Sequence, residues 1–313
     1  MEDVVIIGSG PAGLTAAIYA GRSQMSPLVI TGNALGGQAA TTSEVENYPG
    51  FVEGIGGMEL MQRMQQQAER FGTRVQMDEV VRVNLRVHPF TVEAHGGPID
   101  AKSMIVATGV SPRLLGIPGE SEFKGRGVSY CATCDGFFYK DMKVAVIGGG
   151  DSAVEEAIFL TRFASRVYVV HRRDRLRAQK VVQQRAFENE KIEFVWNTTV
   201  TEVIGQKTVA SIRMRNVETG EESTLAVDGM FSYIGTVPNT TLFEGQLELD
   251  QQGYIITDKR MRTSVLGVLA AGDVQERALR QVATAVASGA VAAVEAEKFI
   301  AELAGQPYPD RQW

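Results

Sequence analysis

The sequence predicts an α/β fold built on parallel sheets, and three observations favour it. At two places, residues 4–30 and 143–170, a short apolar run leads into a glycine-rich loop, a helical pattern and a second apolar run. Each place has the ~30-residue length of a strand–helix–strand unit. Glycine makes up 33 of the 313 residues, more than the usual ~7%, as expected where loops pass close to a ligand.

Length and composition are those of a two-domain globular protein. At roughly 100–200 residues per domain, a chain of 313 residues suggests about two domains. The net charge of −6 argues against a nucleic-acid binder. The longest apolar stretches are far shorter than the ~20 residues of a membrane span, and the opening Met1-Glu2-Asp3 lacks a signal-peptide pattern. We therefore expect a cytoplasmic protein that binds neither nucleic acid nor a membrane.

The strands and helices follow in order from these patterns. Residues 4–7 are a fully apolar run, typical of a strand buried on both faces of a parallel sheet. A helical pattern over 14–20 and a strand at 28–30 complete the first unit. The second unit repeats the order, with strands at 143–147 and 167–170 and a helix over 152–163. Further strands are predicted at 104–107, 230–234 and 268–271, the last before an alanine-rich helix over 281–303. Turn-rich segments at 111–119 and near Pro238-Asn239 predict linkers between two domains.

The loop Gly8-Ser9-Gly10-Pro11-Ala12-Gly13 has the glycine spacing of a dinucleotide-binding turn, and it lies between a predicted strand and a predicted helix. The first glycine permits the tight turn, the second lets the backbone approach a pyrophosphate, and the third allows close helix–strand packing. The N–H groups that begin the helix favour an anion. The acidic residue that binds ribose about 20 residues further on is missing, because the second strand ends in Ile30-Thr31-Gly32-Asn33. Asn33 or a backbone group is the candidate replacement.

A second loop, Gly148-Gly149-Gly150-Asp151-Ser152-Ala153, carries alanine at the third glycine position, which is an accepted variant. The next strand ends in His171-Arg172-Arg173-Asp174-Arg175-Leu176-Arg177, so arginines stand where an NAD site has a carboxylate. Because the planar guanidinium group suits phosphate oxygens, this arrangement predicts NADPH and its 2′-phosphate. The alternative for the arginines is a solvated helix face, and for His171 a packed strand-end position without a ligand.

The two cysteines of the chain, Cys131 and Cys134, both fall in Cys131-Ala132-Thr133-Cys134-Asp135. A zinc site needs four ligands, usually Cys or His, and the three histidines are distant in sequence, so no metal is expected. Two inert buried thiols are an alternative. In a nucleotide-binding protein, however, the spacing favours a redox-active dithiol. Asp135 is then a candidate general acid for the thiolates that reduction releases, or alternatively a turn or N-cap residue.

With these residues placed, the chain resembles the low-molecular-weight thioredoxin reductases of bacteria over nearly its whole length. The most specific stretch is Cys131-Ala132-Thr133-Cys134-Asp135-Gly136-Phe137-Phe138, followed directly by the second glycine loop. The first loop and six shorter stretches also match, namely Thr31-Gly32-Asn33-Ala34-Leu35-Gly36-Gly37-Gln38, Val45-Glu46-Asn47-Tyr48-Pro49-Gly50, Ala107-Thr108-Gly109, His171-Arg172-Arg173, Ala271-Gly272-Asp273-Val274 and Arg280-Gln281.

The resemblance implies two Rossmann-like dinucleotide-binding domains, with the NADPH domain inserted in the FAD domain. Residues 1–112 and 243–313 would form the FAD domain, and 115–241 the NADPH domain with the dithiol. The implied FAD contacts are Gly8, Ser9, Gly10, Pro11, Ala12, Gly13, Thr31, Gly32, Asn33, Ala34, Leu35, Gly36, Gly37, Gln38, Asn47, Asp273, Val274, Arg280, Gln281 and Val282, with Asp273 on the ribityl chain. The implied NADPH contacts are Gly148, Gly149, Gly150, Asp151, Ser152, Ala153, His171, Arg172, Arg173 and Arg177.

The resemblance also implies a reaction sequence. NADPH would reduce the flavin, the flavin would reduce the Cys131–Cys134 disulfide, and the dithiol would reduce thioredoxin. Cys134 would face the flavin, Cys131 would attack thioredoxin, and Asp135 would be the acid. Members of the family rotate one domain against the other through two linkers and form homodimers.

Three other functions compete with this prediction. A relative with the same fold could take electrons from ferredoxin, which would not require the arginine cluster. Another could serve a different disulfide protein. A nucleotide-sensing scaffold could use the dithiol as a redox switch, although a sensor would not need two dinucleotide sites.

Overall fold

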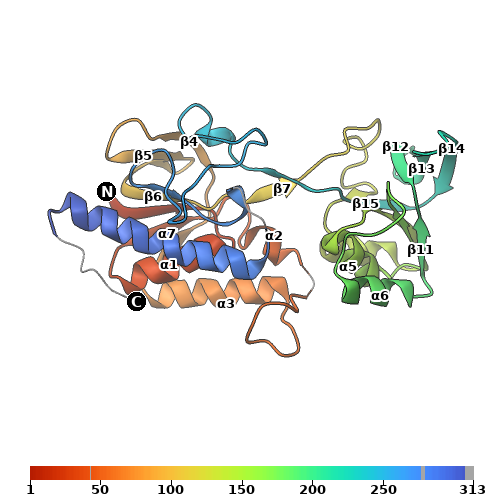
Figure 1. Cartoon of the computed structure of the whole chain (residues 1–313), viewed down its shortest axis with the longest axis horizontal. Helices are drawn as coiled ribbons and strands as arrows, with labels where there is room; N and C mark the ends of the chain where they lie inside the picture. The colour runs from red at the N-terminus through yellow and green to blue at the C-terminus, as the bar shows by residue number, and fades with distance from the viewer. Residues whose placement is uncertain (43, 276–278, 307–313) are drawn as a thin grey trace. The chain divides into compact units, whose positions relative to one another are not determined.

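The computed structural model of the chain describes residues 1–42, 44–275 and 279–306, and it divides into two compact units (Figure 1). The first unit comprises Met1–Ser111 together with the chain from Val237 onwards, and the second is Pro112–Thr236. The second unit is therefore inserted in the sequence of the first. Each unit holds a sheet with a run of parallel strands and helices on one face, so the predicted α/β architecture is confirmed.

The first unit is built on a seven-stranded sheet in the order β3-β2-β1-β6-β5-β4, with β17 also paired to β6. Its strands are β1 (Glu2–Ile7), β2 (Pro27–Ile30), β3 (Arg74–Gln76), β4 (Val80–Asn84), β5 (Phe90–Ala94), β6 (Gly97–Val106) and β17 (Val268–Ala270). The pairs β1–β2, β1–β6, β2–β3 and β6–β17 are parallel, whereas β4, β5 and the start of β6 form an antiparallel meander. Val5, Ile6 and Ile105 on the central strands are fully buried. Their strands are near-continuous apolar runs because the centre of the sheet is covered on both faces.

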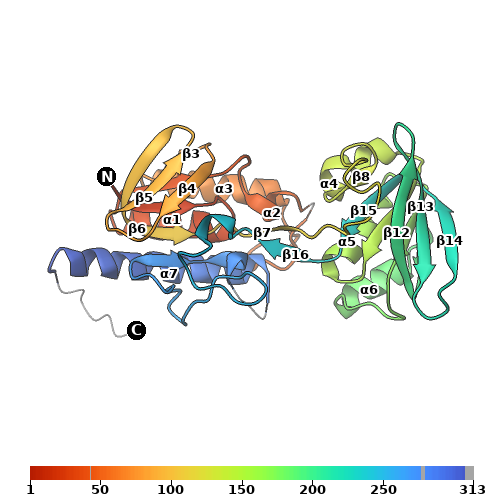
Figure 2. The ribbon, with the colours of Figure 1, turned by 90° about the horizontal axis from the view of Figure 1, so that it is seen from above.

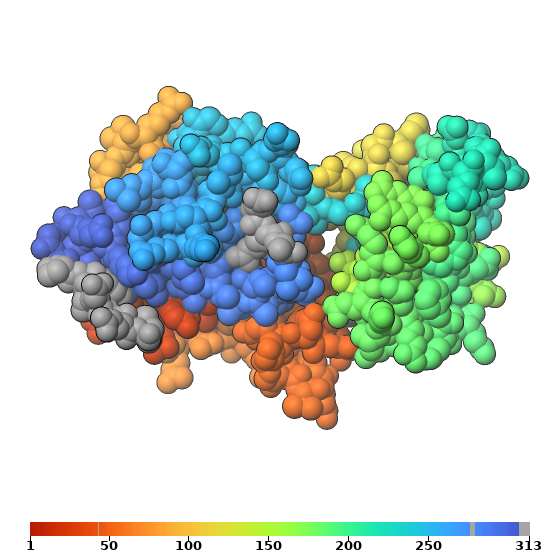
Figure 3. All heavy atoms as spheres, in the orientation of Figure 1, coloured from red at the N-terminus to blue at the C-terminus, as the bar shows by residue number. Residues whose placement is uncertain are grey.

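Helices α1 (Pro11–Arg22) and α7 (Val282–Leu303) pack on one face of this sheet, and α3 (Gly57–Arg70) lies beside α1 (Figure 1). A Cβ atom at Gly289 of α7 would lie 2.1 Å from the carbonyl oxygen of Ala12 in α1, so only glycine permits this close packing. In the space-filling view, α7 and the blue segment up to residue 275 spread over the visible face of this unit (Figure 3). A short helix α2 (Gly37–Ala40) precedes α3, and the opposite face of the sheet packs against the meander and the turns η2 (Thr241–Phe243) and η3 (Gly272–Val274).

The second unit contains a five-stranded parallel sheet in the order β11-β10-β9-β15-β8, and Figure 2 shows the antiparallel sheet β12-β13-β14 beside it. The strands are β8 (Val128–Ser129), β9 (Lys143–Gly148), β10 (Arg166–Val170), β11 (Ile192–Val195), β12 (Thr198–Gly205), β13 (Val209–Asn216), β14 (Glu222–Ala226) and β15 (Gly229–Tyr233). Helix α5 (Asp151–Leu160) covers one face together with α4 (Ala132–Asp135) and η1 (Gly136–Tyr139), while α6 (Lys180–Phe187) packs on α5. The antiparallel sheet covers the other face.

Helix α5 is shorter than the sequence pattern predicts. The predicted helix runs over 152–163, but α5 ends at Leu160. The ammonium group of Lys191 donates hydrogen bonds to the carbonyl oxygens of Thr161 (2.8 Å) and Ala164 (3.2 Å). These bonds satisfy two carbonyls that follow the end of α5, where the chain turns toward β10.

The two connections between the units pair with each other. Strands β7 (Val110–Pro112) and β16 (Thr236–Pro238) form a two-stranded sheet. On the side of the first unit, the amide of Asn239 donates to the carbonyl of Thr108 (2.9 Å) and accepts from the hydroxyl of Ser111 (2.7 Å). On the side of the second unit, the N–H of Arg113 donates to the carbonyl of Gly235 at 2.9 Å. Each linker is thus tied to the other at both of its ends.

Candidate active site

The first glycine loop joins β1 to α1, and two of its glycines are required by packing. A Cβ atom at Gly8, whose φ is +110°, would lie 2.2 Å from the carbonyl oxygen of Ala107. A Cβ atom at Gly13 would lie 1.9 Å from the carbonyl oxygen of Gly8. Gly10 differs, because a Cβ there would meet nothing nearer than 3.9 Å. The loop therefore closes tightly on itself and leaves the backbone at Gly10 open to a ligand.

Ser9 connects this loop to the second predicted FAD segment, residues 31–38. Its buried hydroxyl accepts a hydrogen bond from the N–H of Gly36 at 3.1 Å and lies 3.4 Å from the carbonyl oxygens of Thr31 and Ala34. A Cβ at Gly37 would lie 3.7 Å from the Cα of Gly10. The two glycine-rich segments therefore line one cradle, as the first dinucleotide site requires.

Three further predicted residues of the first unit lie on η3, at the start of α7 and in the segment that contacts it. The amide of Asn47 donates to the side-chain carbonyl of Gln281 at 3.1 Å. Gln281 also caps the N-terminus of α7, where it forms a reciprocal capping box with Thr284. Asp273 lies in η3 beside Gly272, at which a Cβ would lie 2.9 Å from the side chain of Ala12. Asn47 and Gln281 therefore contact each other at the start of α7, and Gly272, next to Asp273, packs against Ala12 in α1.

Arg280 takes a position that the sequence did not indicate. Its guanidinium lies 4.5 Å from the ring centroid of Tyr254, which is buried. This cation–π contact holds the guanidinium of Arg280 over the face of the Tyr254 ring. Val282 begins α7 immediately after the Gln281 cap.

The second glycine loop joins β9 to α5, and as in the first loop one glycine is required by packing while another leaves its backbone open. A Cβ at Gly148 would lie 2.4 Å from the carbonyl oxygen of Tyr233, whereas a Cβ at Gly150 would meet nothing within 4 Å. Ala153 is fully buried against the loop. The carboxylate of Asp151 accepts from the N–H of Gln179 at 2.7 Å. Gly150 is again the open position, so this loop also fits the pyrophosphate of a dinucleotide.

The arginine segment closes onto this second loop. The N–H of Arg177 donates to the carbonyl of Gly149 at 2.7 Å. Arg172, Arg173 and Arg177 are exposed. Within the part of the chain that the structure describes, none of these three guanidinium groups forms an ion pair. They form a cationic rim beside an open glycine loop, which fits a phosphate group better than a salt-bridged helix face would.

His171 is buried beneath the loop. A Cβ at Gly149 would lie 2.5 Å from its imidazole ring, so the ring packs directly against that glycine. Burial, reinforced by the charges of Arg177, Arg173 and Arg172, lowers the pKa of His171. Its Nε2 atom has no hydrogen-bond partner among the described residues. The neutral imidazole therefore packs against the backbone of the loop, and its Nε2 atom is left without a hydrogen bond among the described residues.

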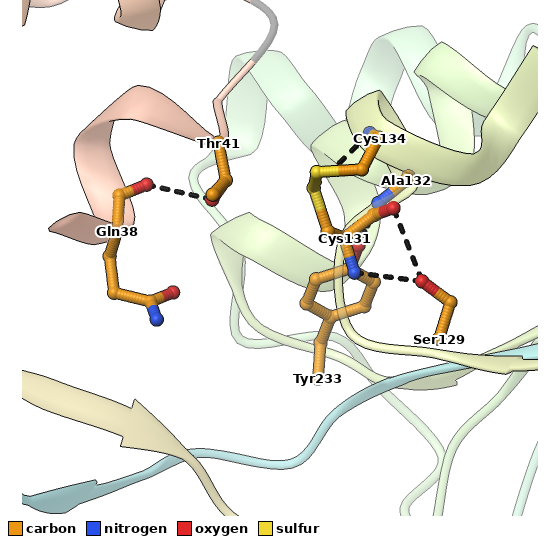
Figure 4. Close-up of a disulfide and its surroundings, with 7 residues drawn as sticks. All are labelled: Gln38, Thr41, Ser129, Cys131, Ala132, Cys134 and Tyr233. Carbon is orange, nitrogen blue, oxygen red and sulfur yellow. Dashed lines mark hydrogen bonds between the residues drawn. A yellow bond between two sulfur atoms is a disulfide. The ribbon is translucent and has the colours of Figure 1, made fainter. Parts of the chain in front are cut away.

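Cys131 and Cys134 form a disulfide at the start of α4 in the second unit (Figure 4). The N–H of Cys134 donates to the sulfur of Cys131 at 3.2 Å. The hydroxyl of Ser129 fixes the backbone of Cys131, because it accepts from the N–H of Cys131 (3.0 Å) and donates to the carbonyl of Cys131 (3.2 Å). The N–H of Ala132 donates to the hydroxyl of Tyr233 at 2.8 Å. The two sulfurs are thus carried on a turn whose backbone is bonded to side chains.

The residues that follow the disulfide combine charge with exposed aromatic surface. Asp135 ends α4, and its N–H donates to the carbonyl of Cys131 at 3.2 Å. Burial raises the pKa of Tyr139 to about 12, and the charge of the Asp135 carboxylate adds to this shift, more than the charge of Asp228 does. Phe137 and Phe138 lie three and four residues after Cys134, and they are 69% and 71% exposed. Exposed aromatic pairs of this kind are typical of protein-binding surfaces.

Comparisons with known proteins agree with this geometry. Residues 2–289 match the family model described as pyridine nucleotide-disulphide oxidoreductase. The chain belongs to this family. It is accordingly an oxidoreductase enzyme, and two glycine loops with a disulfide are the parts that such an oxidoreductase uses.

Individual members of the pyridine nucleotide-disulphide oxidoreductases are similar over nearly the full chain. A thioredoxin reductase of Peptoclostridium litorale is 52% identical over 307 residues, which cover 96% of this chain and 98% of the relative. One of Streptomyces coelicolor is 52% identical over 309 residues, covering 98% and 96%. The crystal structure of Lactococcus lactis thioredoxin reductase superimposes with a TM-score of 0.94 at 46% identity, covering 96% of this chain and all of that one. The resemblance inferred from the motifs is confirmed.

Several residues at the oxidoreductase site carry no sequence signal of their role. Ser129 and Tyr233 contact the disulfide turn, yet neither belongs to a recognisable motif. Two consecutive phenylalanines after the dithiol are a visible signal for an exposed contact surface, but exposure cannot be read from a sequence in which aromatics are normally buried.

Two further properties concern the part of the oxidoreductase that the structure describes. There, no helix combines the length and the apolar character that crossing a membrane requires. Across residues 1–42, 44–275 and 279–306, no group of three or more His, Cys, Asp or Glu side chains is arranged to hold a metal ion.

Proposed function

We propose that this protein reduces the disulfide of thioredoxin with electrons from NADPH, using FAD and NADPH as its cofactors. One observation carries the proposal. The disulfide Cys131–Cys134 lies in the same unit as an open glycine loop whose neighbouring arginines are exposed and make no ion pair among the described residues. A disulfide beside a phosphate-binding nucleotide loop is the arrangement that nicotinamide-driven disulfide reduction needs.

Each cofactor has a set of residues suited to it. FAD would lie on the open backbone at Gly10 and Gly37, with Asn47, Asp273 and Gln281 completing the first cradle. NADPH would lie at Gly150, with Arg172, Arg173 and Arg177 toward its 2′-phosphate. FAD, when bound, supplies two-electron transfer between NADPH and the disulfide.

The dithiol performs the exchange with thioredoxin. Two electrons and two protons convert the Cys131–Cys134 disulfide into two thiols. The thiol of Cys131 gives up its proton, and the resulting thiolate attacks a sulfur of oxidised thioredoxin and forms a mixed disulfide. The thioredoxin cysteine that is released as a thiolate takes up a proton. Cys134 attacks the sulfur of Cys131, which restores the disulfide and releases thioredoxin with its second thiol. Asp135, one residue beyond Cys134 in α4, supplies and accepts the protons of these steps.

Phe137 and Phe138 are the surface on which we expect thioredoxin to dock. Their rings lie 6.4 Å apart, and Phe137 also packs edge-on against Phe163 at 6.2 Å. Phe138 is 71% exposed, so a protein partner can bury it while the partner's disulfide approaches Cys131.

We also infer that the protein is a cytoplasmic homodimer. Tyr19 of α1, Met58 of α3 and Val291 of α7 are 41%, 47% and 38% exposed, and these helices form one layer of the first unit. A second copy of the chain could cover such a surface. The molar mass in solution, measured by light scattering, tests the dimer, since a mass near 34 kDa would contradict it.

An anaerobic titration tests the central proposal. NADPH should bleach the visible flavin absorbance of the purified protein, and oxidised thioredoxin should then restore it. Failure of NADPH to bleach the flavin would contradict the assigned donor and make ferredoxin the next donor to test. Bleaching without recovery on thioredoxin would contradict the assigned acceptor.

A further inference from the structure

The hydroxyl of Tyr233 contacts the backbone of the redox turn. It accepts the hydrogen bond of the Ala132 N–H at 2.8 Å, and Figure 4 shows this contact directly beneath the disulfide. Ala132 is the residue after Cys131, and it is fully buried. Because a buried N–H without a partner destabilises the fold, the tyrosine hydroxyl is a strong determinant of how this turn lies.

Tyr233 is itself held rigidly. It ends β15, where its backbone pairs with Gly148 at the first position of the second glycine loop. Burial, reinforced by the charge of Glu156, raises the pKa of Tyr233. The side chain therefore stays a neutral phenol at physiological pH, able to accept the N–H hydrogen bond. Its position is set by the parallel sheet and not by the turn it contacts.

The hydrogen bond matters differently in the two redox states. In the oxidised protein the bond between the two sulfurs restrains the backbone from Cys131 to Cys134, so Ala132 cannot turn its N–H toward another partner. In the reduced protein this restraint is absent, and the turn can relax to let water or another acceptor replace the hydroxyl. Loss of the hydroxyl should therefore destabilise the disulfide more than the dithiol.

We propose that Tyr233 is a positioning residue for the redox reaction, whose hydroxyl holds the turn of Cys131 and Cys134 in the form that favours the disulfide. Its phenol makes the disulfide harder to reduce and thereby tunes the dithiol as a reductant of its protein substrate. This inference rests on the proposed function, since it assumes that the disulfide cycles between the two states.

The test compares Tyr233→Phe with the wild-type holoprotein. Each protein is equilibrated, without NADPH or thioredoxin, in thiol–disulfide buffers of graded potential, and free thiols are trapped by alkylation and counted by mass. We expect the equilibrium constant for reduction to rise about fivefold, as loss of one hydrogen bond implies, which is roughly 20 mV toward less negative potential for two electrons. Tyr168→Phe is the matched control, because Tyr168 is half-buried on β10 of the same sheet, and it should keep the wild-type value.

The outcomes distinguish failure of the role proposed for Tyr233 from failure of the proposed function. A Tyr233→Phe potential equal to that of wild type, or more negative, would overturn the positioning role while the disulfide still titrates. A disulfide that is not reduced at any buffer potential, in wild type as well, would overturn both proposals. Since phenylalanine preserves the ring and its packing, the flavin absorbance should match wild type.

Discussion

The backbone N–H of Arg177 donates a 2.7 Å hydrogen bond to the carbonyl of Gly149, and this one bond joins the arginine segment to the second glycine loop. It holds the segment with the exposed side chains of Arg172 and Arg177 against the loop that contains the open backbone of Gly150. A nucleotide bound at the loop would therefore meet both a phosphate-binding backbone and a cationic rim.

Replacing Arg172 and Arg177 with alanine should discriminate between the two nicotinamide cofactors. Charge-assisted hydrogen bonds to phosphate contribute about 1.5–3 kcal/mol each, so the Michaelis constant for NADPH should rise at least about tenfold. The constant for NADH, which lacks the 2′-phosphate, should change by less than about threefold. Steady-state kinetics with both cofactors give the comparison. Equal losses for the two would contradict the assignment of the arginines to the 2′-phosphate.

Gly150→Ala should weaken NADPH binding without weakening the fold. A Cβ at Gly150 meets no protein atom within 4 Å, and its extended backbone accepts alanine. The added methyl group instead occupies the approach of the pyrophosphate. We expect the dissociation constant of NADPH to rise about tenfold or more while the melting temperature without NADPH stays that of wild type. Gly148→Ala is the contrasting variant, because its Cβ would clash with the backbone of Tyr233 and should lower the melting temperature.

Cys134→Ser should separate the two halves of the reaction. NADPH should still bleach the flavin, because neither nucleotide loop contains this residue, whereas reduction of thioredoxin should fall to background because the disulfide cannot form. Stopped-flow absorbance measures the first half and thioredoxin turnover the second. If flavin bleaching were lost together with turnover, Cys134 would have a role in cofactor binding instead.

Phe138→Ala should weaken the encounter with thioredoxin and little else. Burying a phenylalanine side chain contributes about 1.5–3 kcal/mol, so the Michaelis constant for thioredoxin should rise about tenfold or more. Reduction of a small aromatic disulfide, which needs no docking surface, should proceed at the wild-type rate. A parallel loss with both substrates would show that Phe138 acts on the dithiol and not on docking.

Glu156→Gln should change how stability depends on pH. Burial, with a contribution from the charge of Glu155, raises the pKa of Glu156 to about 7. A raised folded-state pKa means that the folded protein binds this proton more tightly than the unfolded chain. The stability that the proton contributes is therefore fully present below the ordinary pKa near 4.5 and is lost as the pH rises through about 7.

Glutamine at this position carries no charge at any pH. The variant should therefore gain on wild type in melting temperature between pH 5 and 8, with a difference in unfolding free energy of at most about 3 kcal/mol. Glu193→Gln, at an exposed site on β11 of the same unit, is the control and should follow the wild-type profile. Parallel pH profiles for Glu156→Gln and wild type would refute the raised pKa.

Much of the fold could be predicted because its signals are local. The apolar runs of β1 and β9 and the glycines that follow them lie within a few residues of each other, and strand burial on both faces leaves an unbroken apolar pattern. The end of α5 could not be predicted, because Lys191 caps it from 30 residues away. The pairing of β7 with β16 likewise depends on sheet edges that meet only after the rest of the chain has folded.

The sequence by itself determined the chemistry of this protein: two dinucleotide loops, an arginine-rich strand end and a C-x-x-C dithiol. Such chemistry requires particular residue types at short, fixed spacing, which a sequence displays directly. The tertiary structure decided which side chains serve these motifs. Tyr233 reaches Ala132 across 101 residues and Gln281 reaches Asn47 across 234. Those contacts arise from the packing of strands and helices, and packing brings together residues whose spacing along the chain carries no pattern.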